Sequence, residues 1–347
     1  MTVPAAGDAA CTAADSGART ASPPYATGAG GAGTRRVLSR SGGAATLVAL
    51  ALLVLAPVLR RYDLGASPPY LVAGLLLGLP HGAVDHLVPA WRSTRTRPLR
   101  TRLAVLLGYA TIATAALLAF RAAPTPATLT FLALSVLHFG TADEGFHAER
   151  AGRPIRYPVS GVLARGGPPV VVPLALWPGT VDPLMTSVAP GAAALLTVEV
   201  RLLAAAGLLL AVTATVVRAL RAGRTAEAGE PVLLILLFAA VPPALAVGAY
   251  FAAWHSTRHV ARLLSDDPAN RDDLAAGRLG PPVHRFIRRA ALPSLAAVAV
   301  LAALVGGPAD PLPATVAVLA ALTVPHAALV AWTDRSGSAG TPRHDHS

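Results

Sequence analysis

Residues 230–262 read EPVLLILLFAAVPPALAVGAYFAAWHSTRHVAR, two apolar runs that meet at Pro242 and Pro243. The runs 230–241 and 243–262 form either one kinked helix or two helices joined as a hairpin. A membrane span needs about 20 predominantly apolar residues, so the second run is long enough and the first is short. The choice between kink and hairpin decides on which side of a membrane the chain continues after residue 262.

The rest of the chain has the composition of a membrane protein. Of its 347 residues, 54% are hydrophobic and 14% are charged, about half the usual charged share. This argues against a soluble enzyme, a nucleic-acid-binding protein and a disordered protein. All 29 basic residues are arginine, and most lie between apolar runs, as in the cytoplasmic loops of polytopic membrane proteins. The single Cys11 excludes a disulfide framework and a thiolate metal site within the chain.

Ten apolar segments are candidate transmembrane helices, so we expect an all-α, multi-pass integral protein of the cell membrane. They are 44–60, 69–90, 101–121, 126–142, 157–178, 198–217, 230–241, 243–262, 287–306 and 313–333. Residues 1–43, rich in Ala, Gly, Thr and Ser, are expected to form a disordered tail. Residues 335–347 are expected to form a polar C-terminal tail, which leaves 44–334 as the membrane domain.

The placement of arginine favours the hairpin at Pro242 and Pro243. If the N-terminal tail is cytoplasmic, a ten-span chain keeps the arginine-rich segment from Arg262 to Arg289 cytoplasmic as well. One kinked helix would move that segment outside, against the positive-inside rule. We therefore predict ten spans with both termini in the cytoplasm.

Four histidine clusters lie in or beside these apolar segments. They are GLPHGAVDH (78–86) with His81, LHFGTAD (137–143) with His138, YFAAWHSTRH (250–259) with His255 and His259, and LTVPHAALV (322–330) with His326. Ionisable residues inside a membrane are costly and are functional candidates by default. The ten-span topology places one histidine of each cluster in the cytoplasmic half of an even-numbered span, where all four can meet at one depth.

The spacing of these residues is compatible with a metal site. His255 and His259 are four residues apart, so on a helix they share one face and can reach one ion. Imidazoles without thiolates suit Fe(II), Zn, Cu or Ni. Each histidine also has a structural alternative: His255 and His259 can extend toward lipid head groups, and His81 or His138 can bond a backbone carbonyl.

Other polar residues near the clusters have secondary roles. Asp85, four residues after His81, is expected to accept a hydrogen bond from a metal-binding imidazole or to pair with an arginine such as Arg92. Asp143 is expected to support His138 or to cap its helix. His86 lies about 140° round the helix from His81 and is less suited to the same ion. The remaining assignments are loop positions for His147 and His284, and a paired or lipid-facing position for Arg258.

These motifs, in this order, resemble the Brp/Blh family of membrane β-carotene 15,15′-dioxygenases. A further similar stretch is LARGGPPVVVPL at 163–174, and the resemblance covers roughly residues 65–332. It implies an Fe(2+)-dependent oxygenase that splits the central double bond of β-carotene with O2 into two molecules of retinal. The ligands that it implies are His81, His138, His255 and His259. The Pro-His at His326 also recurs in the family, and we expect His326, like Asp85 and Asp143, beside the ligands or the pocket. The site is expected to lie within the lipid bilayer, and the expected product alone makes a retinal-binding rhodopsin a natural recipient.

Two other functions fit the same residues. A transporter or channel could use intramembrane His and Asp as a relay for protons or metal ions, with Pro242 and Pro243 breaking a discontinuous helix. A haem-binding electron carrier could use a pair of axial histidines. Metal flux in proteoliposomes without carotenoid turnover would indicate the first, and a Soret band would indicate the second.

Overall fold

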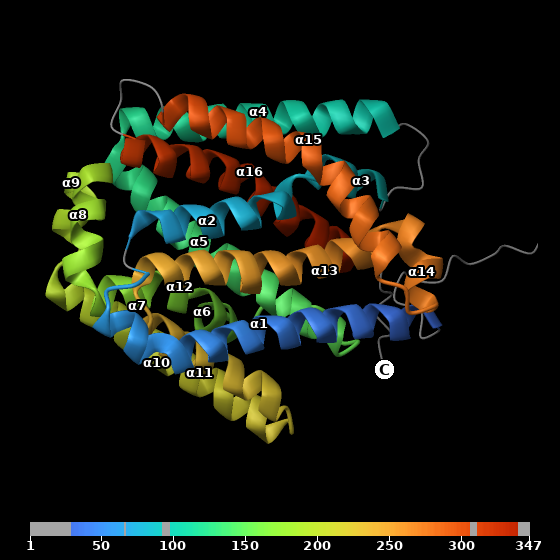
Figure 1. Ribbon diagram of the computed structural model, residues 1–347, viewed down its shortest axis with the longest axis horizontal. Coiled ribbons are helices and arrows are strands. Elements are labelled where there is room, and N and C mark those ends of the chain that lie inside the picture. Colours follow the sequence, from blue (N-terminus) through green and yellow to red (C-terminus); the bar gives the residue numbers. More distant parts are fainter. Residues whose placement is uncertain (1–28, 66, 92–97, 306–310, 339–347) are drawn as a thin grey trace, which may run out of the picture.

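The structure is a computed structural model that describes residues 29–338 except 66, 92–97 and 306–310. Every regular element in this part of the chain is helical, and most of the long helices run roughly parallel or antiparallel to one another (Figure 1). In chain order they are α1 (Ala29–Arg61), α2 (Pro68–Gly78), η1 (Leu79–Gly82), η2 (Asp85–Leu87), α3 (Val88–Trp91), α4 (Pro98–Ala122), α5 (Pro124–Arg150), α6 (Val159–Gly166), α7 (Pro168–Leu176), α8 (Pro178–Val188), α9 (Pro190–Leu195), α10 (Val198–Arg221), α11 (Thr225–Ala240), α12 (Pro243–Ala249), η3 (Tyr250–Ser256), α13 (Thr257–Asp266), η4 (Pro268–Asn270), α14 (Arg271–Ala275), α15 (Gly280–Val305) and α16 (Pro311–Ser338). Of these, η1, η2 and η4 are short 3₁₀ helices and η3 is a π-helix.

Proline sets the first residue of many of these helices. Proline suits the first helical position because its φ is already helical and its missing N–H would have no partner there. It begins α2, α4, α5, α7, α8, α9, α12 and α16. Between α11 and α12, Val241 and Pro242 are extended, with ψ of 137° and 136°, because a residue before proline avoids the helical region. The pair Pro242 and Pro243 therefore ends one helix and begins the next.

The chain turns back at this point, so α11 and α12–α13 form a hairpin. Arg153 Nη2 lies 2.6 Å from Glu227 Oε1, at the start of α11. Arg262 Nη2, near the end of α13, lies 2.8 Å from Glu149 Oε1. Glu149 lies in the last turn of α5 and Arg153 lies three residues after that helix ends, so the start of α11 and the second half of α13 lie at the same end of the bundle. The kinked-helix alternative does not fit these contacts.

Within the described residues, seven helices are long and apolar enough to cross a membrane. They are Gly31–Arg61, Pro68–Trp91, Leu99–Ala122, Pro124–Arg150, Val198–Arg221, Gly280–Ala303 and Thr315–Arg335. The bent pair α6 and α7, at 57° to each other, would be an eighth span. The expected number of ten is not reached. The helix α11 has only 16 residues, and the continuous segment after Pro242 carries His255, Arg258, His259 and Arg262 and is not among these apolar helices. These helices nevertheless indicate a multi-pass membrane protein.

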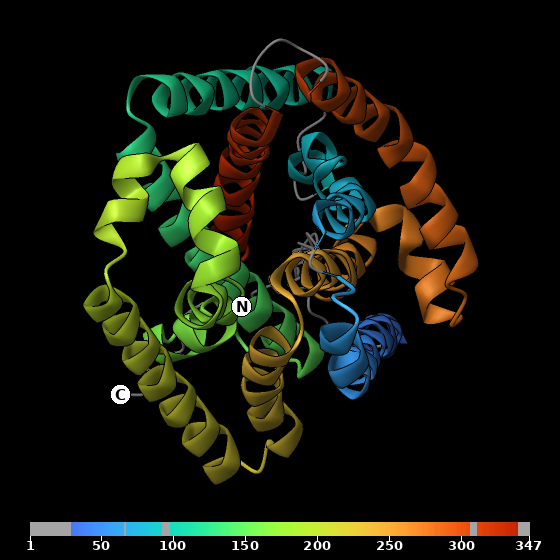
Figure 2. The same cartoon turned by 60° about the vertical axis from the view of Figure 1, so that its left-hand side comes forward.

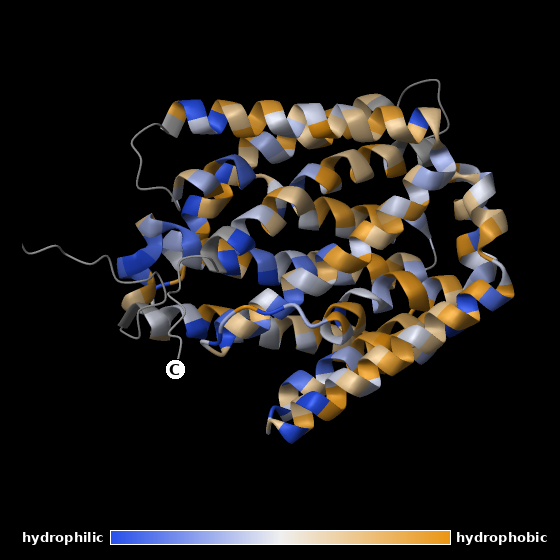
Figure 3. Cartoon of the chain, turned by 180° about the vertical axis from the view of Figure 1, so that it is seen from behind, coloured by the Kyte–Doolittle hydropathy of each residue, from blue (hydrophilic) through white to orange (hydrophobic). Residues whose placement is uncertain are grey.

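The outer surface is apolar over much of the length of the bundle. Val54, Leu210 and Leu292 are each more than 70% exposed, which is favourable only against an apolar solvent such as lipid. Hydrophilic residues gather at the end of the bundle that carries α14 and at the turn between α10 and α11 (Figure 3). The end that carries α14 contains the arginine-rich segment from Arg262 to Arg289 that we assigned to the cytoplasm.

The first helix begins earlier than its composition indicates. Residues 29–43, which we expected in the disordered tail, form the first turns of α1. Val37 and Leu38 are buried in a cluster with Phe146 and Leu274, so packing against the bundle overrides the weak helix propensity of this glycine-rich stretch. Residues 1–28 and 339–347 lie outside the described residues, and α16 continues to Ser338, past the expected start of the C-terminal tail.

The segment α12–η3–α13 runs through the interior of the bundle (Figure 2). The helices α1, α2 and α5 pack directly against it, and α16 packs against α5 and α4. Close approach of α5 and α6 depends on glycine: a Cβ atom at Gly140 would lie 2.1 Å from the carbonyl oxygen of Val162. Small residues allow such backbone contact between helices in a membrane, and here the contact fixes the part of α5 next to His138.

Candidate metal centre

Five histidine rings from four segments far apart in the sequence converge in the interior. They are His81 in η1, His138 in α5, His255 in η3, His259 in α13 and His326 in α16. The ring centroids of His81 and His255 are 5.1 Å apart, and those of His138 and His255 are 5.0 Å apart. All five residues are at most 7% exposed. The structure thus brings together the histidines that the topology placed at one depth.

His326 is central to this cluster. Its ring centroid lies 4.8 Å from that of His81 and 5.0 Å from that of His138. The ring centroids of His326 and His259 are 5.1 Å apart. The sequence placed His326 beside the ligands; the structure places its ring in direct contact with three of the other four.

The π-helix η3 shapes the local geometry of His255 and His259. Single-turn π segments inside α-helices occur frequently at functional sites. Here the ring planes of His255 and His259 are within 11° of parallel and their centroids are 6.3 Å apart. Gly78 permits the close fit of α2 against η3, since a Cβ atom there would lie 2.4 Å from Phe251 Cδ1. The two histidines share one face, as their spacing predicts.

Hydrogen bonds fix the orientation of two of the rings. His81 Nδ1 lies 2.6 Å from the carbonyl oxygen of Gly78, so Nδ1 is the donor and Nε2 keeps its lone pair. His326 Nδ1 lies 2.7 Å from Asp85 Oδ2, and that carboxylate oxygen also accepts a bond of 2.6 Å from the Tyr109 hydroxyl. Such outer contacts set the tautomer and raise the basicity of a metal-binding imidazole.

Asp85 therefore supports His326, not His81. The expectation for Asp85 assumed an α-helix, in which residues 81 and 85 share a face. The chain instead passes through the 3₁₀ helices η1 and η2. Because a 3₁₀ helix has about three residues per turn, residues 81 and 85 no longer share a face. The alternative partner, Arg92, lies outside the described residues.

The cluster contains several buried ring nitrogens without a hydrogen-bond partner in the described part of the chain. They are His138 Nε2, His255 Nε2, His259 Nδ1, His259 Nε2 and His326 Nε2. Leaving one such group unsatisfied costs about 1–3 kcal/mol, so the arrangement is unfavourable for folding alone. A metal ion satisfies imidazole nitrogens directly, and the donor set suits Fe, Zn, Cu or Ni. The residues present thus fit a metal ion.

Two groups of side chains in the cluster have ligand atoms close enough to hold one ion. One is His81, His255 and His326, and the other is Asp85, His259 and His326. Within each group all ligand atoms lie within 4.8 Å of one another. His326 is the histidine that belongs to both groups.

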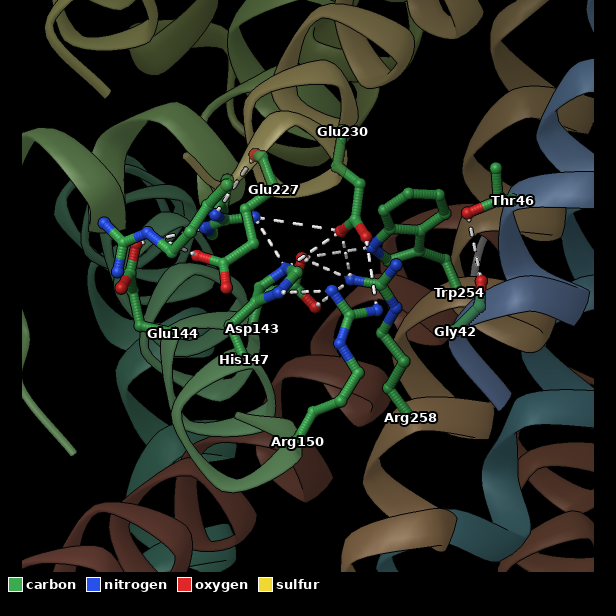
Figure 4. A network of polar contacts seen from close by, with 12 residues as sticks. Gly42, Thr46, Asp143, Glu144, His147, Arg150, Glu227, Glu230, Trp254 and Arg258 are labelled. Carbon is green, nitrogen blue, oxygen red and sulfur yellow. Dashed lines mark hydrogen bonds and ion pairs between the residues drawn. The ribbon is translucent and has the colours of Figure 1, made fainter. Parts of the chain in front are cut away.

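An ion-pair network borders the cluster and holds its helices together (Figure 4). Arg258 Nη1 lies 3.0 Å from Asp143 Oδ1 and 2.9 Å from Glu230 Oε2. Asp143 also accepts a hydrogen bond of 3.1 Å from Trp254 Nε1, and the Arg258 guanidinium lies 3.8 Å from the centroid of the same ring. Arg258 is thus a carboxylate-paired residue that connects α13, α5 and α11.

Two sequence-based assignments change in this network. Asp143 bonds Arg258 and Trp254, not His138, and it lies inside α5 instead of capping it. His147 is in α5, 1% exposed, with Nε2 2.9 Å from Glu230 Oε2, and is no loop residue. The sequence after residue 143 is polar and was therefore assigned to a loop. Its charged side chains can lie inside the bundle because residues distant in the sequence pair with them.

The same network includes Arg165, from the stretch LARGG, and Glu144, and it pairs both. Arg165 Nε lies 3.0 Å from Glu144 Oε1, and Arg165 Nη1 lies 2.7 Å from His147 Nε2. Asp143, His147 and Glu230 also have the spacing of a metal site, but the guanidinium groups of Arg258 and Arg165 already provide the positive charge there. Glu230, at the start of an apolar run, was the signal that could have revealed this network, since intramembrane charges are paired.

Apolar rings cover one side of the histidine cluster. The centroid of Phe139 lies 4.8 Å from that of His255, and that of Phe251 lies 5.2 Å from that of His81. On another side, a small cavity is lined by Asp85, His259 and Arg262, together with residues of α16. His284 is exposed in the first turns of α15, and His86 is partly buried next to Asp85.

Comparison with known proteins gives one consistent result. A family described as Beta-carotene 15,15′-dioxygenase matches residues 72–334. A probable β-carotene 15,15′-dioxygenase Blh of Halobacterium salinarum is 33% identical over 332 residues, 87% of this chain and 94% of its own length. The probable dioxygenase Brp of the same organism is 30% identical, covering 67% of this chain and 71% of its own length. A β-carotene 15,15′-dioxygenase of an uncultured marine bacterium is 28% identical, covering 53% of this chain and 65% of its own length. No solved structure matches the chain.

Proposed function

The chain belongs to the β-carotene 15,15′-dioxygenase family, and on this premise we propose that it splits the central double bond of β-carotene with O2 into two molecules of all-trans-retinal. The 15,15′ C=C bond breaks and each of its carbons gains one oxygen atom, so both atoms of one O2 are consumed. The observation that carries this proposal is the cluster of five buried imidazoles, four of which have ring nitrogens without a partner among the described residues.

The proposed metal ligands are His81, His138, His255 and His259, and the proposed ion is Fe(2+). Neutral imidazoles leave a ferrous ion its full charge and room for further ligands. When bound, the ion supplies the redox chemistry that O2 needs to react with a closed-shell polyene. The other site residues orient these rings: Gly78 accepts the bond from His81 Nδ1, and the Arg258–Asp143 pair holds α13 against α5.

The surroundings of the cluster suit an apolar substrate. β-Carotene dissolves in the hydrocarbon core of a membrane, so a site within the helical bundle can receive it without transfer into water. Phe139 and Phe251 place apolar rings beside His255 and His81, where a polyene would find contacts that exclude water. We assign residues 44–334, extended by the first turns of α1, to one oxygenase domain in the cell membrane, and a retinal-binding rhodopsin is the proposed recipient of the product.

A transporter or ion relay is less well supported. The relatives are named as dioxygenases, and Asp143 and Glu230 are already paired with Arg258 and do not present free carboxylates along a path.

The direct test is expression in a host that accumulates β-carotene, followed by chromatography of the extracted retinoids. We expect retinal with the wild-type chain and none with His255→Ala or His259→Ala, each inserted in the membrane at wild-type level. The matched control is His284→Ala, because His284 is exposed and is not one of the five histidines of the cluster. A correctly inserted wild-type protein that forms no retinal would overturn the function, and full activity in both cluster variants would overturn the ligand assignment.

A further inference from the structure

We propose that His326 is a fifth imidazole ligand of the same metal ion, held in position by Asp85 and Tyr109; this inference rests on the proposed function. Four other histidines account for the ligands that the family resemblance implies, and His326 is not among them. In the cluster, however, the ring of His326 lies as close to the other imidazoles as they lie to one another.

The first observation is the position of the ring. His326 comes from α16 and enters the cluster between rings from three other segments, with centroid distances of 4.8 Å to His81, 5.0 Å to His138 and 5.1 Å to His259. Both groups of side chains in the cluster whose ligand atoms lie within 4.8 Å of one another include His326. A residue that only lined a substrate pocket would not need a nitrogen atom within 4.8 Å of the ligand atoms of both groups.

The second observation is that the two nitrogens of the His326 ring have different surroundings. Nδ1 faces Asp85 Oδ2 at 2.7 Å, and both side chains are about 95% buried. Nε2 is buried and has no hydrogen-bond partner among the described residues. The carboxylate makes Nδ1 the proton donor, so Nε2 carries a lone pair into the cluster, as in the carboxylate–histidine–metal arrangement of known metalloproteins.

The third observation is that the ring has little freedom to turn away. Asp85 is itself fixed by the hydroxyl of Tyr109 at 2.6 Å. Gly82 leaves only enough space for the imidazole, since a Cβ atom there would lie 3.3 Å from His326 Nδ1. A simple structural histidine would have both nitrogens bonded to protein groups when this deeply buried, whereas His326 has one bonded and one directed at other imidazoles.

The test measures metal binding by the purified full-length protein in detergent or nanodiscs, with no carotenoid present. Co²⁺ serves as the probe, its dissociation constant is determined by competition with a chelator, and directly bonded histidine nitrogens are counted by pulsed EPR on ¹⁵N-histidine-labelled protein carrying Fe²⁺ and nitric oxide. We expect His326→Ala to raise the dissociation constant at least tenfold and to reduce the nitrogen count by one. The matched control His86→Ala, from the segment next to Asp85 but outside the cluster, leaves both values unchanged.

A second variant covers the case in which His326→Ala does not fold. Asp85→Asn keeps the size of the side chain and removes the carboxylate charge that supports the ring, and a loss of such an outer contact typically weakens metal affinity about 10–100-fold. Unchanged affinity in Asp85→Asn, or an unchanged nitrogen count and affinity in folded His326→Ala, overturns the inference while leaving the proposed function intact. A wild-type protein that binds no Co²⁺ or Fe²⁺ overturns both.

Discussion

Arg258 Nη1 lies 3.0 Å from Asp143 Oδ1, and this buried ion pair joins the segment that carries His255 and His259 to the helix that carries His138. Both side chains are at most 5% exposed. The pair therefore sets the distance between two parts of the candidate metal centre that are more than 100 residues apart in the sequence.

Arg258→Ala is expected to destabilise the protein strongly. The change leaves Asp143 buried without its cation, whereas Glu230 keeps Arg150 and Arg165 within 3.8 Å. Breaking a buried pair from one side typically costs about 3–5 kcal/mol. The measurement is thermal unfolding of the purified protein in detergent. Arg278→Ala is the matched control, because Arg278 pairs with Asp273 at an exposed site, where ion pairs contribute little. Equal melting temperatures for the two variants would contradict the structural role given to Arg258.

Gly140→Ala is expected to separate α5 from α6 and so displace His138. The new Cβ atom would lie 2.1 Å from a backbone oxygen of Val162, which cannot move as a side chain can. Gly108→Ala is the control, because nothing lies within 4 Å of a Cβ atom there, and alanine is the better helix former by about 1 kcal/mol. We expect reduced retinal formation and a lower melting temperature for Gly140→Ala only. Wild-type behaviour of Gly140→Ala would show that the α5–α6 contact is looser than described.

Removal of metal is expected to lower the stability of the wild-type protein. An ion that binds only the folded state at 100 times its dissociation constant contributes about 2.7 kcal/mol, and its loss leaves the nitrogens of His138, His255 and His259 unsatisfied. Melting temperature is measured with a chelator and after addition of Fe²⁺ in excess. His259→Ala should respond much less to both treatments. A wild-type melting temperature that changes neither with chelator nor with added Fe²⁺ would argue against a metal centre.

The assignment of the arginine-rich end of the bundle to the cytoplasm predicts the accessibility of two turns. In a Cys11→Ser background, a cysteine replacing Ala222, in the turn between α10 and α11, should react with membrane-impermeant reagents only after the membrane is opened. A cysteine replacing Gly179, at the start of α8 and the opposite end of the bundle (Figure 1), should react in intact cells. Both sites are exposed. The reverse pattern of labelling would place the arginine-rich end outside the cell.

Much of the fold followed from the sequence because its causes are local. Apolar runs of spanning length and arginine between the runs predicted an all-helical membrane protein, and the same arginines favoured the hairpin at Pro242 and Pro243. The convergence of His81, His138, His255 and His326 followed from topology, since alternating directions place matching positions of even-numbered segments at one end.

The remaining details depend on contacts between distant residues. The sequence near Asp85 looks like an α-helix, but η1 and η2 turn its carboxylate toward His326, 241 residues away. His147 looked like a loop residue because Glu230, its neutralising partner, follows it by more than 80 residues. The first turns of α1 looked disordered because only the fold provides Phe146 and Leu274 to bury Leu38.

The spacing of Arg258 and Arg262 in the α-helix α13 has a consequence for how this chain can change in length. A single residue inserted or deleted between them turns everything beyond it by about 100°, so Arg258 and Arg262 could not both keep their carboxylate partners Asp143 and Glu149. Gaps in alignments of related chains should therefore be absent between residues 258 and 262, and substitutions, not insertions or deletions, should account for the variation there. Exposed turns such as that at Gly223 carry no such restriction.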